Sequence, residues 1–150
     1  MYLIFKHKKH DNDISANSIS LWTRSDYIHA SIVFNNNLVS GSWKDGVQWK
    51  RIDEVIKYPD LWLIYEFLDY QNYDVALNFF NSQVGNKFDY ASIFYNHILP
   101  FSFNDKEKWY CSEITTKLLQ ILYPNSVFSN LIPEQTTPGD LVNIVQRNFE

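Results

Sequence analysis

Cys111 is the only cysteine of this 150-residue chain, and its position suits nucleophilic chemistry. It directly precedes a segment whose apolar residues recur at helical spacing: Ile114, Leu118, Leu119 and Leu122. The unpaired N–H groups and the positive dipole end at a helix start favour a thiolate over a thiol. A single cysteine cannot form an internal disulfide. The sequence therefore leaves packing or reactivity as its role.

A cysteine nucleophile needs a base, and His29 is the best candidate among four histidines. It lies in the middle of an apolar segment, 27–34, where burying an imidazole is unfavourable unless the ring has a partner. His7 and His10 belong to a charged N-terminal run, and His97 lies in a predicted helix. Surface, capping or packing roles explain those three.

Period-two patterns and turn residues predict strands at 2–5, 27–34, 38–42, 47–51 and 61–67. The three middle strands are joined by short turns at 35–37 and 45–46, which predicts an antiparallel meander. The strand at 61–67 is the most apolar of the five, and we expect it to be central in the sheet.

Helices are predicted at 17–24, 53–57, 72–84, 89–99, from 111 onward and from 137 onward. We expect the helix at 72–84 to bury Val75, Phe79 and Phe80, and the last helix to bury Leu141, Ile144 and Val145. Strands come first and helices later, which is typical of an α+β domain with helices packed against an antiparallel sheet. The chain length fits a single domain, 1–150.

The composition excludes several classes of function. A net charge of −4 argues against nonspecific nucleic-acid binding, and the basic run 6–10 is explained by a strand end and a turn. No segment approaches the roughly 18 apolar residues of a membrane span, and the N-terminus lacks a signal-peptide pattern. The single cysteine fits a reducing compartment, so we expect a cytoplasmic location. One cysteine and scattered histidines predict no metal site and no cofactor.

Four segments, in this order along the chain, resemble the permuted papain-like (permuted NlpC-type) cysteine hydrolases. They are Ile28-His29-Ala30-Ser31-Ile32-Val33-Phe34, Gly85-Asn86-Lys87-Phe88-Asp89-Tyr90, Trp109-Tyr110-Cys111-Ser112-Glu113 and Thr137-Pro138-Gly139-Asp140-Leu141. The Tyr-Cys-Ser-Glu element is the most specific of the four. In this family the histidine precedes the cysteine, as it does here.

The resemblance implies a circularly permuted papain-like core with a partly barrel-like meander. Cys111 would be the nucleophile, His29 the general base, and the backbone amide of Cys111 an oxyanion donor. The implied substrate contains an amide, of peptidoglycan or isopeptide type, and is cleaved through an acyl-enzyme. A looser similarity to the lecithin retinol acyltransferase relatives leaves a thioesterase or acyltransferase on lipid-like acyl groups as an alternative.

The third catalytic position departs from the family pattern. Related enzymes often carry a polar residue, frequently a glutamate, on the strand after the histidine strand, and alignment places Ser40 there. Ser40, Ser42 or Gln48 could orient the imidazole through a neutral hydrogen bond, which stabilises an imidazolium less than a carboxylate does. The missing carboxylate also supports a third alternative, an inactive binding module of the same fold.

Aromatic residues near these segments are expected to line the substrate cleft. Tyr27 shares the predicted strand face of His29, and Trp109 and Tyr110 directly precede the nucleophile. Trp43 and Trp49 are further candidates for an aromatic wall, although ordinary packing explains each of them as well. The oligomeric state stays open.

Overall fold

The protein is described by a computed structural model that covers residues 1–9, 14–88 and 108–149. The predicted helix at 89–99, with His97 and Asp89, lies outside the described residues, as do His10 and the loop 101–107. The five main strands are β1 (Tyr2–His7), β2 (Tyr27–Val33), β3 (Leu38–Trp43), β4 (Gly46–Arg51) and β5 (Trp62–Glu66).

These strands form one antiparallel sheet in the order β4-β3-β2-β1-β5. The predicted meander of β2, β3 and β4 is confirmed, because tight turns join them. The sheet is not closed, so the barrel-like part of the prediction is wrong. The N-terminal strand β1 pairs with β2 on one edge and with β5 on the other, and β4 and β5 remain the two outer strands.

The expectation that 61–67 forms a central strand is also wrong. β5 pairs with β1 alone and lies at the edge of the sheet. Its apolar character has another cause, since side chains from both of its faces contact hydrophobic clusters. Leu63 and Tyr65 pack against the main core, and Trp62 packs against a smaller cluster on the other face. Ile64 is left 47% exposed.

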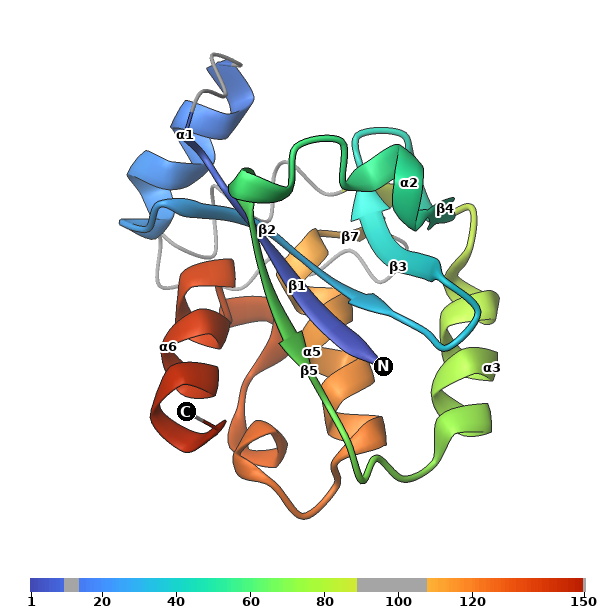
Figure 1. The fold of residues 1–150 in the computed structure, drawn as a ribbon. Coiled ribbons are helices and arrows are strands. Elements are labelled where there is room, and N and C mark those ends of the chain that lie inside the picture. Colours follow the sequence, from blue (N-terminus) through green and yellow to red (C-terminus); the bar gives the residue numbers. More distant parts are fainter. Residues whose placement is uncertain (10–13, 89–107, 150) are drawn as a thin grey trace.

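The helices are α1 (Ile14–Thr23), α2 (Ile52–Val55), α3 (Tyr73–Gln83), α5 (Cys111–Leu122) and α6 (Pro138–Phe149). Three 3-10 turns add η1 (Pro59–Leu61), η2 (Val127–Asn130) and η3 (Pro133–Gln135), and β6 (Lys87–Phe88) pairs in parallel with β7 (Lys108–Trp109). α1 begins three residues earlier than predicted, and α2 ends at Val55. Figure 1 shows α5 running behind the sheet, with α6 and α3 on either side of it.

The two faces of the sheet bury different sets of side chains. Ala30, Ile32 and Phe34 join Ile114 and Leu118 of α5 in the main core, because alternate residues of a strand point to the same face. Val33, Ile4 and Val39 form the smaller cluster on the opposite face. Partly buried residues of α2 and the segment after it, Ile52, Val55 and Ile56, cover that cluster together with Trp43 and Trp62.

The helical predictions differ in outcome. In α3, Phe80 is fully buried and Phe79 partly, but Val75 is 57% exposed and Ala76 takes its place in the core. In α6, the buried side holds Leu141 and Val145, with Ile144 partly buried, as predicted. Within the described residues, no helix has the length and apolarity that a membrane crossing requires.

Candidate active site

Cys111 is the first residue of α5, as predicted, and its side chain is buried. Tyr110 before it is extended, with φ −106° and ψ 163°, so the chain leaves β7 and turns directly into the helix. Tyr110 makes no side-chain cap, and its carbonyl accepts the first helical bond from Ile114, at 3.2 Å. The N–H groups of the first turn have no partner within the helix.

The start of α5 meets β2 where the β2–β3 ladder is open. β2 and β3 are paired only at Ile32↔Ser40 and Val33↔Val39. Further back along β2, α5 supplies the partners: Thr115 Oγ1 donates to the Ala30 carbonyl at 3.1 Å, and Cys111 Sγ lies 4.0 Å from the Ile28 carbonyl oxygen. Thr115 and Cys111 are one turn apart, so a single face of α5 lines this edge of β2.

The electrostatic environment of Cys111 has two opposing effects. Burial raises the pKa of the thiol to about 11, because a thiolate there would lose its hydration. The backbone N–H groups of Ala30, Ser112 and Cys111 itself oppose this and favour the thiolate. Burial is the larger effect, so the thiol is protonated at neutral pH in this arrangement.

His29 lies on the face of the sheet opposite to α5. Its neighbour Ala30 is buried in the main core, and strand alternation directs His29 the other way. Its ring stacks on Trp43 at a centroid distance of 4.3 Å and meets Trp62 edge-on at 6.3 Å. Both tryptophans pack against the smaller hydrophobic cluster, which confirms the face.

The imidazole of His29 is neutral in this environment. Burial, together with the positive charges of Lys6 and Lys50, lowers its pKa to about 3. Its Nε2 lies 2.7 Å from Ser31 Oγ, two residues along the same face. Sequence reasoning did not assign Ser31 a role. The spacing of two within a predicted strand was the signal that could have identified it.

The structure does not bring Cys111 and His29 into hydrogen-bond contact among the described residues. Instead, the sulfur lies against the backbone on both sides of His29, near the Ile28 carbonyl and the Ala30 N–H, while the ring projects from the other face. The sequence order predicted two facing side chains. It could not specify that α5 would approach the edge of β2 from the face opposite to the ring.

Ser40 does not orient His29, which corrects the sequence assignment. It pairs with Ile32 and thus shares the α5 side of the sheet, and its hydroxyl donates to the Ile32 carbonyl at 3.0 Å. Ser42 is on the same side and donates to the Trp109 carbonyl at 2.5 Å. Gln48 pairs with Gly41 and so lies on the His29 face.

The three predicted cleft residues do not share one wall. Tyr27 is separated from the His29 face by a register shift between Lys6 and His7, and its ring contacts Phe5 and His7 instead. This bulge breaks the alternation on which the prediction depended. The Trp109 indole donates to Gln83 Oε1 at 2.9 Å and packs against the main core, away from His29.

Tyr110 does lie beside the sulfur, in a narrow recess with room for about one water molecule. Its hydroxyl donates to the Pro133 carbonyl at 3.0 Å, and burial followed by the negative charge of Glu113 raises its pKa. The recess is also lined by Cys111, Ser112, Ile19 and Thr137. Ser112 Oγ is fully buried and is the one buried side-chain polar atom of the described residues without a hydrogen-bond partner.

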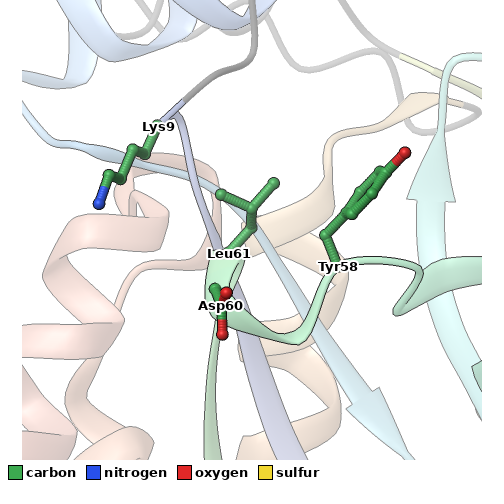
Figure 2. Close-up of a pocket in the computed structure, with 4 residues that line it drawn as sticks. All are labelled: Lys9, Tyr58, Asp60 and Leu61. Carbon is green, nitrogen blue, oxygen red and sulfur yellow. The ribbon is translucent and has the colours of Figure 1, made fainter.

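A larger hollow opens near the end of β1 and the start of β5. Its volume is about 420 Å³, within the range of small-molecule sites, and Lys9, Tyr58, Asp60 and Leu61 line it. Figure 2 shows Leu61 between Lys9 on one side and Tyr58 on the other. Leu61 directly precedes Trp62, the edge-on neighbour of His29, so the hollow lies at the sheet end that carries the imidazole.

Comparison with protein-family models found no match for this chain, and searches of curated proteins and of solved structures also returned none. Within residues 1–9, 14–88 and 108–149, no group of three or more histidine, cysteine or acidic residues is arranged to hold a metal ion.

Proposed function

We propose that this protein is a cysteine-dependent hydrolase of amide bonds, with Cys111 as nucleophile and His29 as general base. One observation carries the proposal. The start of α5 places the Cys111 thiol at the unpaired edge of β2, beside the backbone of residue 29. Three backbone N–H groups surround the sulfur there. A helix N-terminus favours the thiolate form of a cysteine, and a cysteine nucleophile also needs a base, for which His29 is the candidate on this strand.

Proton transfer requires the His29 ring to leave Ser31 and turn about its own side-chain bonds toward the open β2–β3 edge. The imidazole then takes the thiol proton, and the thiolate attacks the substrate carbonyl. The N–H groups of Cys111 and Ser112 stabilise the oxyanion. His29 returns the proton to the leaving amine, and water hydrolyses the acyl-enzyme with His29 again as base.

In the resting arrangement both groups are neutral, and the raised thiol pKa and lowered imidazole pKa oppose proton transfer until the ring leaves its buried position. A thiol with a raised pKa and an imidazole with a lowered pKa form no stable ion pair until they meet. Active-site hydrogen bonds are often incomplete without substrate and close in the substrate complex.

A second candidate is an inactive binding module of the same fold. It is favoured by the burial of Cys111, which is 4% exposed, and by the direction of the His29 ring. In that case Cys111 and Thr115 serve only to complete the free edge of β2. The remaining alternative, a thioesterase acting on lipid-like acyl groups, would differ from the amide hydrolase in its substrate.

Alkylation of Cys111 distinguishes the enzyme from the module, since no other thiol is present. Iodoacetamide modification, followed by intact mass, should have a component at pH 6 to 7 that depends on His29. His29→Ala should remove this component and leave reactivity that rises only toward the thiol pKa of about 11. His7→Ala, which alters an outlying histidine, is the matched control.

If labelling requires denaturant, or if the pH profile is the same with and without His29, the catalytic proposal is wrong. Hydrolysis of matched amide, thioester and muropeptide substrates, by the wild type and by Cys111→Ala, then identifies the reaction. Preference for the amide supports the proposal, and preference for a long-chain thioester supports the acyl alternative.

A further inference from the structure

A further hollow lies between α6 and the segment 130–136. Its volume is about 540 Å³, within the range of small-molecule sites. α6 lines it with Asp140, Asn143, Ile144 and Arg147. These positions are three or four residues apart, so they form a single face of the helix. The face carries a carboxylate at one end and a guanidinium at the other, with an amide and an apolar side chain between them.

The opposite wall of this hollow is held in place by hydrogen bonds. Gln120 Nε2 donates to the Leu131 carbonyl at 2.9 Å, and the Tyr110 hydroxyl donates to the Pro133 carbonyl at 3.0 Å. Between these two anchors the backbone is extended, and Ile132 is 54% exposed beside the hollow. The wall is therefore formed before any ligand binds, which lowers the entropic cost of binding.

The charged groups of the hollow keep capacity for a ligand. One oxygen of the Asp140 carboxylate, Oδ2, accepts both bonds from Thr137, and these bonds leave Oδ1 available. The Arg147 guanidinium makes no ion pair or hydrogen bond with any residue that the structure describes. The side-chain amides of Asn143 and Gln135, which also line the hollow, have no hydrogen-bond partner in the same part of the chain.

The separation of the two charges indicates the size of the ligand. Asp140 and Arg147 are seven positions apart on α6, which corresponds to about 10.5 Å along a helix. Three residues of an extended peptide span about 10–11 Å. A free tripeptide therefore carries its ammonium and its carboxylate at the spacing of the two side chains.

We propose that this hollow binds a short extended peptide, about three residues long, with both termini free. The peptide ammonium pairs with Asp140, and its carboxylate pairs with Arg147, whose guanidinium fork matches carboxylate geometry. A central apolar side chain packs on Ile144 and Ile132, and the free amides of the hollow bond to the peptide groups. The site is separate from the proposed hydrolase function, because Cys111 does not line it.

Titration of the intact protein with the tripeptide Ala-Leu-Ala tests the site, with NMR following the backbone amides of Ile144 and Ile132. The free tripeptide should cause saturable shifts. N-acetyl-Ala-Leu-Ala and Ala-Leu-Ala-amide should each bind about threefold more weakly, because each loses one ion pair. The dipeptide Ala-Leu is too short to reach both charges and should also bind more weakly. These probes test both ends of the site without changing the protein.

Two substitutions assign the ends to their side chains. Arg147→Gln should weaken the free tripeptide about threefold and leave binding of Ala-Leu-Ala-amide unchanged. Asp140→Asn, which keeps an acceptor for the helix cap, should weaken the free tripeptide and leave the N-acetyl peptide unchanged. Lys57→Gln, which removes an exposed cation that does not line the hollow, is the matched control.

Equal binding of the free and the singly blocked tripeptides, or of the dipeptide and the tripeptide, would overturn the inference. An equal loss for all peptides in Arg147→Gln would also contradict it, because the effect would then be structural. Sodium acetate is the last probe. If it displaces the tripeptide at equal or lower concentration, the hollow binds anions in general and the peptide assignment is wrong.

Discussion

At the scale of single residues, His29 is the residue whose surroundings matter most. Two tryptophans cover its ring, Ser31 is its hydrogen-bond neighbour, and two lysines lie nearby. An imidazole in this position is held neutral by burial and by positive charge. The same two effects make it a weaker base, so the ring must leave this environment before it can accept a proton from a thiol.

The neutrality of His29 predicts a pH dependence of stability. In the unfolded chain the imidazole takes up a proton below pH 6.5, whereas in the fold its pKa is about 3. The unfolded state therefore binds more protons between these values, so the free energy of unfolding falls as pH drops from 6.5 toward 3. This group contributes a slope of at most about 1.4 kcal/mol per pH unit.

Urea unfolding of the wild type and His29→Gln from pH 7 to pH 4 measures this effect as a difference in slope. His7→Gln is the control, since that histidine is outside the tryptophan pair. Parallel curves for the wild type and His29→Gln would show that the ring is solvated and not enclosed.

At the scale of elements, the start of α6 is specified locally. Thr137 Oγ1 accepts from the Asp140 N–H at 3.1 Å, and the Asp140 carboxylate accepts from both the N–H and the hydroxyl of Thr137, at 2.9 and 2.7 Å. Pro138 occupies the first helical position, where no N–H is needed. This reciprocal cap satisfies the helix start without tertiary contacts.

Thr137→Ala should lower the free energy of unfolding by about 1 kcal/mol, because the Asp140 N–H loses its acceptor and the Asp140 carboxylate loses one donor. Thr137→Ser keeps the hydroxyl and should retain most of the stability. Chemical denaturation of the three proteins tests this, and equal loss in both variants would assign the effect to the methyl group instead of the cap.

At the scale of the whole molecule, the sheet separates two environments. α5 packs its apolar side on β2 in the main core, and the opposite face carries the tryptophans, His29 and lysines. Leu118, fully buried in the main core, connects α5 to the sheet side of this core. The position of Cys111 depends on this packing.

Leu118→Ala should therefore destabilise the fold by about 2–5 kcal/mol, the usual range for a buried leucine. Leu21→Ala is the matched control, because Leu21 is also helical but 76% exposed, and it should change stability little. Thermal or urea unfolding compares them. A small effect of Leu118→Ala would contradict close packing between α5 and β2.

Local pattern was enough to predict the elements that depend on local physics. The meander of β2, β3 and β4 follows from its turns, the α6 start from its cap, and the apolar face of α5 from a 3.6-residue period. The start of α5 at Cys111 was predicted in the same way. Val75 was misassigned because a helical pattern does not specify which neighbouring apolar residue faces the core.

Only the tertiary structure decided the relation between Cys111 and His29. The sequence by itself determined a thiol at a helix start and an imidazole within a strand. The packing of α5 on one face of the sheet, and the alternation that directs His29 to the other, place the sulfur beside the His29 backbone and the ring among tryptophans and lysines. Strand register and sheet order are set by contacts between distant segments, so no local period encodes which face a helix will cover.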